Sequence, residues 1–339
     1  MKKLIGILLL SLWFVSCSSE ESDRVTIDNP EISMEIPAGF PEVNVSFTTN
    51  KPTQYGVELG AKLFSDKRFS ANNTVSCASC HIPTSAFADH NPQAIGIENR
   101  VGLRNTPSLQ NLAFLQFYNW DGNKLQLENQ PLVPIITHEE MDSSILEVIG
   151  KIQGDATYKD LFDKAFGDEN ITPERIYKSI AQFEYTLISA NSKYDKVKRN
   201  EAAFAETEAK GYAVFQQKCV SCHSTELFTD QSFRNIGFPI NTDTNEAGRA
   251  RVTGNMEDYM RFRVPSLRNV ALTAPYGSFG QFASLEAVLD YFDKGVLDAE
   301  NLDAIFKKNG NKISLSTTEK VQLIAFLNTL TDEQFLKKQ

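Results

Sequence analysis

The sequence Cys77-Ala-Ser-Cys80-His81 returns later in the chain as Cys219-Val-Ser-Cys222-His223. In the pattern Cys-x-x-Cys-His, the two thiols bond covalently to the vinyl groups of haem, and the adjacent imidazole binds the iron. A four-cysteine zinc site would leave the histidine after each pair unexplained, and a thioredoxin-like pair needs a βαβ setting that the sequence lacks. The pattern therefore predicts two haem c groups, attached at Cys77, Cys80, Cys219 and Cys222, with His81 and His223 as iron ligands.

The remaining cysteine, Cys17, lies at the end of an export signal. Two lysines precede an apolar run over Leu4–Leu10, which is too short to span a membrane as a helix. Val15-Ser16-Cys17 resembles a bacterial lipobox, so we expect residues 1–16 to be removed and Cys17 to be acylated. An ordinary cleavage site beside Cys17 is the alternative, but it would leave an unpaired thiol exposed. Because haem is attached outside the cytoplasm, both features predict an exported, periplasmic protein that a lipid anchor holds at a membrane.

Charge and composition limit the function classes. The chain has 339 residues and a formal net charge of −9, and 41% of its residues are hydrophobic. This length suits two domains, and this apolar content is enough for packed cores. Net acidity argues against nucleic acid as a partner and suits docking of a basic or neutral redox protein, although it also simply promotes solubility.

The two haem motifs lie in a degenerate internal repeat. The segment Thr106–Phe114 parallels Val264–Leu272, with Pro, Ser, Leu, Asn and Ala in register. Each motif is also followed by a Phe-x-Asp sequence, Phe87-Ala-Asp89 in the first half and Phe228-Thr-Asp230 in the second. These parallels predict one cytochrome module used twice.

Apolar periodicity predicts a mostly α fold with two cytochrome c-like domains, each with one covalently bound haem c. Thr172 is the expected N-cap of a helix that begins at Pro173, and residues 25–47 form an expected extended arm. The sequence has no sustained alternation of apolar and polar residues, the pattern that would predict a β-sheet. We expect helices over Gln54–Phe64, Glu147–Phe166, Pro173–Ser189, Glu206–Gln217 and Thr317–Leu330. The expected division is 1–16 signal peptide, 17–51 tether and arm, 52–200 first haem domain and 201–339 second haem domain, with the last helix able to pack back on the first.

Three further segments are Phe117–Gly122, Leu127–Pro131 and His138–Met141. With the haem motifs and the repeat, they resemble the bacterial dihaem cytochrome c peroxidases, a family that includes the related enzyme that matures tryptophan tryptophylquinone. The resemblance covers Pro52–Leu330. It implies that the first haem reacts with hydrogen peroxide, that the second receives electrons from a small c-type cytochrome or a cupredoxin, and that Ca²⁺ lies between the domains.

The resemblance also implies roles for single residues. Glu140 matches the carboxylate that moves a proton between the two peroxide oxygens. The residues alone favour a capping box, Thr137-x-x-Glu140, that opens a helix through Ile145–Ile149. Gln130 matches an amide that orients peroxide, with a surface glutamine as the alternative. Trp120 matches a tryptophan that carries electrons between the haems, with a core tryptophan as the alternative.

Two positions depart from the family pattern. Ile97 stands where many members have a second histidine ligand for the first haem, so we expect an open sixth position there, with His90 as the competing ligand. Phe292 stands where the family has the methionine or tyrosine ligand of the second haem. A one-residue slip would make Tyr291 the ligand; a five-coordinate haem under Phe292 is equally compatible. Met256 and Met260 would need a different loop path.

For Ca²⁺, the resemblance implies the side chain of Asn105 and the backbone carbonyls of Thr273 and Pro275 as oxygen ligands. Each also has a plain turn-forming explanation. The sequence thus predicts a membrane-anchored dihaem peroxidase, with a homodimer as a further expectation. The alternatives are a dihaem oxidase of a protein or organic substrate and a membrane-tethered electron carrier. A pure electron carrier is disfavoured because electron transfer is best served by two strong axial ligands on each iron, whereas the first haem is expected to have an open position.

Overall fold

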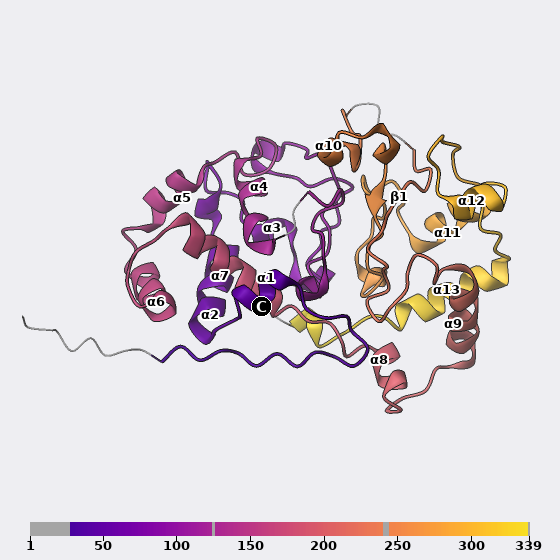
Figure 1. Ribbon diagram of the computed structural model, residues 1–339, viewed down its shortest axis with the longest axis horizontal. Coiled ribbons are helices and arrows are strands. Elements are labelled where there is room, and N and C mark those ends of the chain that lie inside the picture. The colour runs from indigo at the N-terminus through magenta and orange to yellow at the C-terminus, as the bar shows by residue number, and fades with distance from the viewer. Residues whose placement is uncertain (1–27, 124–125, 240–243, 338–339) are drawn as a thin grey trace, which may run out of the picture.

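A computed structural model describes residues 28–123, 126–239 and 244–337 (Figure 1). The expected export signal and Cys17 lie outside these residues. The fold is mostly helical, and its only sheet within the described ranges is a two-residue antiparallel pair, β1 (Phe233–Arg234) with β2 (Phe262–Arg263). No described helix combines the length and the apolar character that crossing a membrane requires.

Thirteen α-helices are present in the described part of the chain: α1 (Val45–Thr49), α2 (Gln54–Ser65), α3 (Cys77–Cys80), α4 (Leu132–Ile136), α5 (Ile145–Ile152), α6 (Ala156–Phe166), α7 (Pro173–Tyr185), α8 (Lys193–Lys198), α9 (Glu206–Lys218), α10 (Ala250–Thr253), α11 (Leu285–Lys294), α12 (Ala304–Lys308) and α13 (Thr317–Asn328). Single 3-10 turns of the repeated segments and the chain end are η4 (Leu112–Phe114), η7 (Val270–Leu272) and η8 (Phe335–Lys337).

Helix starts follow local capping chemistry. The predicted cap at Thr172 is confirmed, because its hydroxyl accepts a hydrogen bond from the Arg175 amide and Pro173 opens α7. The single helix predicted over Glu147–Phe166 is wrong. The helix is interrupted after α5, at residues 153–155, and the Asp155 side chain caps the start of α6. A glycine at 154 favours the break because it lowers helix propensity.

The capping box at Thr137 and Glu140, which was the alternative to a catalytic role for Glu140, is not formed. Thr137 is the C-cap of α4, and the box that opens α5 consists of Ser144 and Glu147. The Ser144 hydroxyl accepts from the Glu147 amide, and the Glu147 carboxylate accepts from the Ser144 amide. Glu140 is therefore not a capping residue.

The chain builds the same helix pair twice. Helix α2 crosses α7 at Gly60, where an added Cβ would lie 1.9 Å from the Ser179 carbonyl oxygen. Helix α9 crosses α13 at Gly211, where an added Cβ would lie 1.9 Å from the Gln322 carbonyl oxygen. Glycine at each crossing lets two helix backbones approach more closely than any side chain would permit. The predicted repeat is thus present in three dimensions, one copy at each end of the molecule (Figure 1).

The repeated Pro-Ser-Leu segments end alike. Asn111 and Asn269 both adopt left-handed backbone conformations, with φ of 58° and 56°, which asparagine tolerates better than most residues. Their side-chain amides converge on one residue, since Asn111 donates to the Ser189 carbonyl and Asn269 to the Ser189 hydroxyl. Ser189 therefore joins the two copies of the module.

Further contacts join the two halves. The Arg268 guanidinium is fully buried and forms two hydrogen bonds with Asp195, at 3.0 and 2.9 Å. Helix α13 packs on α9, while Phe335 of η8 packs against Phe87 in the N-terminal core. It is therefore the chain end, beyond the last helix, that returns to the first half.

The N-terminal arm runs along one edge of the molecule and turns back toward its centre at α1 (Figure 1). Its described part is extended, as predicted, but ends in α1 at Val45 (Figure 1). Phe40 packs edge-on against Phe114, and Phe47 packs edge-on against Tyr185. The arm is thereby tied to the turn that ends the first repeated segment, and α1 to the end of α7.

Candidate functional site

The N-terminal haem motif lies on one helical turn. Helix α3 spans Cys77–Cys80, and His81 is its C-cap. The Nδ1 atom of His81 lies 2.8 Å from the Phe87 carbonyl oxygen, which assigns the proton to Nδ1 and leaves the Nε2 lone pair free for iron. Burial lowers the pKa of His81 to about 4, so the imidazole is neutral, the form that binds metal.

The C-terminal motif repeats this arrangement at the end of α9, where Cys219 is the C-cap. The Nδ1 atom of His223 lies 3.0 Å from the Phe228 carbonyl oxygen, and burial lowers the pKa of this imidazole as well. Neither motif forms disulfides: all four thiols in the described ranges are free.

The repeated segments explain the shared geometry. The backbone carbonyl of Pro107 lies next to the imidazole of His81, and that of Pro265 lies next to the imidazole of His223. The neighbouring serines act in parallel: Ser108 donates to the Ala86 carbonyl and Ser266 to the Leu227 carbonyl, 2.6 Å away in the second case. Each repeated segment therefore positions the imidazole of its own motif.

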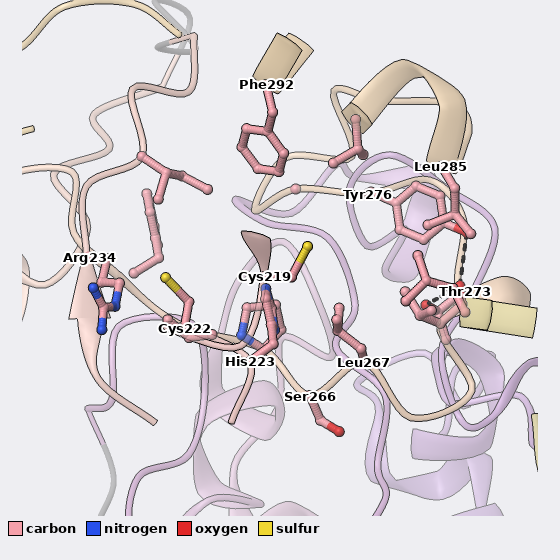
Figure 2. Close-up of a pocket in the computed structure, with 18 of the residues that line it drawn as sticks. Cys219, Cys222, His223, Arg234, Ser266, Leu267, Thr273, Tyr276, Leu285 and Phe292 are labelled. Carbon is pink, nitrogen blue, oxygen red and sulfur yellow. Dashed lines mark hydrogen bonds between the residues drawn. The ribbon is translucent and has the colours of Figure 1, made fainter. Parts of the chain in front are cut away.

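Each motif opens into a cavity. The N-terminal cavity, about 830 Å³, contains Cys77, Cys80 and His81 in its wall. The C-terminal cavity, about 270 Å³, contains Cys219, Cys222 and His223, and its wall is mostly apolar (Figure 2). Thiols on one turn beside a neutral imidazole and an apolar space suit a covalently held haem.

Two groups that the sequence did not single out suit the carboxylates that haem carries. Arg263 lines both cavities and forms no ion pair within the described part of the chain; burial lowers its pKa to about 10. The hydroxyl of Ser278 lines the C-terminal cavity, is buried, and has no hydrogen-bond partner among the described residues. Among the described residues, the Arg263 guanidinium donates only one long hydrogen bond, from Nε to the Asn119 carbonyl oxygen at 3.4 Å, and the Ser278 hydroxyl has no partner, so both groups favour an anionic ligand group.

The N-terminal cavity gathers the predicted catalytic residues. Glu140, Gln130 and Trp120 all line it. Gln130 donates from Nε2 to the Asn119 side-chain oxygen at 3.2 Å, so its own carbonyl oxygen stays available. Burial, and then the negative charge of Glu139, raises the pKa of the Glu140 carboxyl.

The loop around Gly96 and Ile97 holds Glu140 in place. From the sequence, this loop was notable only because Ile97 replaces a histidine. The Ile97 amide donates to the Glu140 carbonyl oxygen at 2.8 Å. At Gly96 an added Cβ would lie 2.1 Å from the Glu139 carbonyl oxygen, so only glycine permits this approach. Ile97 itself is buried and is not part of the cavity wall.

His90 lies away from the N-terminal cavity. It is exposed, its Nε2 lies 2.8 Å from the Ser85 hydroxyl, and its Nδ1 lies 3.4 Å from the Ala274 carbonyl oxygen. The wall of this cavity, as far as the structure describes it, contains no histidine besides His81. The geometry therefore favours an open position opposite His81 over ligation by His90.

Trp120 lies between the two cavities and lines both. Its indole N–H donates to the Asn105 carbonyl oxygen at 2.9 Å, and its own carbonyl accepts from the Arg263 amide at 2.8 Å. The ring packs edge-on against Phe262, with centroids 6.5 Å apart. The position is compatible with electron transfer between groups bound in the two cavities.

At the C-terminal cavity, Phe292 is part of the wall and Tyr291 is not. The Tyr291 hydroxyl donates to the Gly237 carbonyl and accepts from the Leu297 amide at 3.1 Å. The one-residue shift that would place Tyr291 in the cavity is therefore absent from the structure, which favours the alternative with Phe292 at this position. Met256 is 70% exposed, and Met260 does not line this cavity.

The predicted calcium ligands belong to one cavity wall. Asn105, Thr273 and Pro275 all line the C-terminal cavity. The Asn105 side chain donates from Nδ2 to the Asn91 carbonyl at 3.0 Å, which leaves Oδ1 as its metal-binding atom. The described residues contain no cluster of three His, Cys, Asp or Glu side chains that could hold a metal.

One acidic residue of the N-terminal cavity escaped the sequence analysis. Glu184 on α7 is only 5% exposed, and its Oε2 has no hydrogen-bond partner in the described part of the chain. Burial, and then the charge of Glu128, raises the pKa of Glu184 to about 8. No sequence signal distinguishes it from an ordinary helix glutamate.

Known proteins resemble this chain in sequence and structure. The family model described as di-haem cytochrome c peroxidase matches residues 54–203. The methylamine utilization protein MauG of Methylophilus methylotrophus is 34% identical over 83% of this chain and 84% of its own length. The cytochrome c551 peroxidase of Nitrosomonas europaea is 35% identical over 82% and 80%, respectively. A crystal structure of a MauG-like protein associated with microbial copper homeostasis superposes with a TM-score of 0.79 at 31% identity, covering 90% of this chain and 97% of that one.

Proposed function

Because the chain belongs to the di-haem cytochrome c peroxidase family, we propose that it reduces hydrogen peroxide to water in the N-terminal cavity. One observation carries this proposal. Glu140 and Gln130 line the N-terminal cavity, whereas no aspartate or glutamate lines the described wall of the C-terminal cavity. Only the first cavity therefore offers a carboxylate for proton transfer beside a bound peroxide.

The reaction consumes one hydrogen peroxide, two protons and two electrons, and yields two water molecules. Haem, when bound at Cys77 and Cys80, supplies the redox change that breaks the O–O bond. The Glu140 carboxylate accepts the proton of the oxygen nearer His81 and returns it to the outer oxygen, which leaves as water. The Gln130 amide orients the peroxide, and the loop at Gly96 keeps Glu140 at its position.

Cys219, Cys222 and His223 would hold the second haem, and Trp120 would carry electrons from it to the N-terminal cavity. A small c-type cytochrome or a cupredoxin is the proposed donor, since the net charge of −9 suits a basic or neutral partner. The position of Trp120 between the cavities and its hydrogen bond to Asn105 support this route. Nucleic acid is not a proposed partner.

The proposed cofactors are two haem c groups and one Ca²⁺ at Asn105, Thr273 and Pro275. We place the mature protein in the periplasm, anchored at Cys17 and able to form a homodimer. For the ion, chelation of the purified holoprotein should loosen the contact between the halves and lower the thermal midpoint, and added Ca²⁺ should restore it. A midpoint that does not respond to chelation would leave the three residues as turn formers.

A second candidate is oxidation of a protein or organic substrate. The relative named methylamine utilization protein MauG and the MauG-like solved structure favour it. So does the open position opposite His81, because an oxidised state formed there can draw electrons from a substrate as well as from a donor protein. The non-catalytic carrier is disfavoured by Glu140 and Gln130 in the cavity wall.

The deciding experiment measures hydrogen peroxide turnover with a reduced small cytochrome c. Fully oxidised holoprotein is compared with a half-reduced sample. Equal turnover supports a peroxidase whose N-terminal haem is open opposite His81. Turnover in the half-reduced sample alone would indicate a ligand released on reduction, with His90→Ala as the variant that tests it. No turnover in either sample would favour the substrate-oxidising candidate.

A further inference from the structure

The wall of the C-terminal cavity that lies opposite His223, here called the ceiling, is formed by Phe292 and the apolar residues around it. Phe292 faces this cavity from the last turn of α11, across the cavity from His223 (Figure 2). The residues of the cavity wall that cluster with Phe292 are apolar: Ile236, Phe238, Ile305, Phe306 and Ile313, while Tyr291 packs beside Phe292 from outside the wall. A haem attached at Cys219 and Cys222 therefore has a hydrocarbon surface on the side opposite its histidine.

Packing fixes Phe292 in this place. Its ring stacks on Phe238, with centroids 6.4 Å apart and planes 16° apart, and tilts against Phe306 at 5.6 Å. Its carbonyl oxygen accepts from the Ile313 amide at 2.8 Å. Successive residues of a helix point about 100° apart, so Tyr291 cannot face the same space while Phe292 does.

No side chain of the described cavity wall is free to bind iron from this side. The wall contains no methionine and no histidine other than His223. Its one tyrosine, Tyr276, donates its hydroxyl to the Val270 carbonyl at 2.8 Å, and Lys218 donates to the Glu319 carboxylate at 2.6 Å. Phe292 itself has no atom that can coordinate a metal.

From this geometry we infer that the C-terminal haem site is a binding site for small neutral diatomic molecules, such as carbon monoxide, under Phe292. Such a ligand needs a free coordination position and an apolar space but no hydrogen-bond donor. Peroxide is not the expected ligand, because no carboxylate lines this wall to move its proton. The inference rests only on haem attachment at Cys219 and Cys222, and is independent of peroxide turnover.

The test is the number of carbon monoxide molecules that the fully reduced holoprotein binds, followed by absorption and resonance Raman spectra. Phe292→Met places a thioether in the ceiling and should remove one binding position by creating a sixth ligand. Tyr291→Phe is the matched neighbour and should leave both the count and the spectra of the C-terminal haem unchanged. Haem content is measured in each variant, so that a protein that loses haem is recognised.

A wild-type count of one carbon monoxide per haem supports the inference, and so does a count that falls by one in Phe292→Met. If the wild-type protein binds one or no carbon monoxide per protein molecule and Phe292→Met does not change that number, the inference is overturned. A count that rises in Tyr291→Phe would also overturn it, because Tyr291 would then be the ligand. Peroxide turnover of the same samples tests the proposed function separately.

Discussion

Replacing Glu140 by glutamine keeps the shape of the side chain and removes its ability to carry a proton. The other acidic groups in the described wall of the N-terminal cavity are poor substitutes. Asp121 is held by Arg104 at 2.8 Å, and Glu184, with a pKa of about 8, is protonated at neutral pH. Glu139 is exposed. Proton transfer in the variant would therefore depend on water.

General acid–base catalysis by a positioned side chain contributes roughly 10²- to 10⁴-fold. Since no neighbouring group replaces Glu140, we expect its loss to lower the second-order rate constant for hydrogen peroxide by about this factor, which corresponds to about 3–5 kcal/mol of activation free energy. The assay is stopped-flow mixing of holoprotein with peroxide, followed by steady-state turnover with a reduced donor. Haem content and spectra of Glu140→Gln should match the parent protein.

The pH dependence gives an independent check. Glu140 acts as a carboxylate, so the rate should fall as pH drops through its pKa. Burial and Glu139 raise that pKa, so the acid limb should lie above ~4.3, the value of an ordinary glutamate. The control Glu139→Gln removes the weaker cause and should shift the limb to lower pH while keeping turnover. A Glu140→Gln protein within tenfold of the parent, or one with the same acid limb, would refute the assignment.

Four other variants test the route and the scaffold. Trp120→Phe should slow the re-reduction of the N-terminal haem in stopped-flow traces while leaving its first reaction with peroxide unchanged; equal re-reduction would remove Trp120 from the route. Gly60→Ala should lower the free energy of unfolding by about 1–3 kcal/mol, because the added methyl group meets the α7 backbone. In the control Gly150→Ala the added methyl group meets nothing within 4 Å, so the free energy of unfolding should rise by about 0.5–1 kcal/mol. Both are measured by denaturant unfolding, and equal effects of the two substitutions would contradict the crossing geometry. Arg268→Ala should cost about 3–5 kcal/mol in the same measurement, because it leaves the Asp195 carboxylate buried without its partner; a loss below about 1 kcal/mol would show that water replaces the guanidinium.

Local patterns gave the attachment chemistry and most of the helices. Thr172 and Pro173 mark a helix start by the chemistry of adjacent residues, and the structure has that start. The Pro-Ser-Leu repeat was visible as similarity, yet its purpose was not: the backbone of Pro107 contacts His81, a residue far away in the sequence. Long-range contacts of this kind leave no periodic signal along the chain.

Competing local patterns produced the errors. Thr137-x-x-Glu140 fits a capping box as well as Ser144-x-x-Glu147 does, and only the turn between α4 and α5 decides between them. The position of Phe292 depends on helix register, where one residue changes the direction of a side chain by about 100°. Arg263 and Glu184 could not be recognised because the position of Arg263 in both cavity walls, and the burial of the Glu184 Oε2 without a partner among the described residues, are properties of the folded molecule.

The two halves differ in the segment that follows each repeated Pro-Ser-Leu sequence. After η4, the segment that includes the described residues 126–144 brings Gln130 and Glu140 to the N-terminal cavity. After η7 the chain passes through residues 273–284 into α11, which brings Phe292 to the C-terminal cavity. The repeated parts position the histidine and the thiols, so they are under the same geometric constraint in both halves. The segment opposite the histidine is free of that constraint, which explains how one module can offer proton transfer at one haem site and a closed hydrocarbon ceiling at the other. Peroxide chemistry would then be confined to the N-terminal cavity by the absence of a carboxylate in the described wall of the other, rather than by a difference in haem attachment.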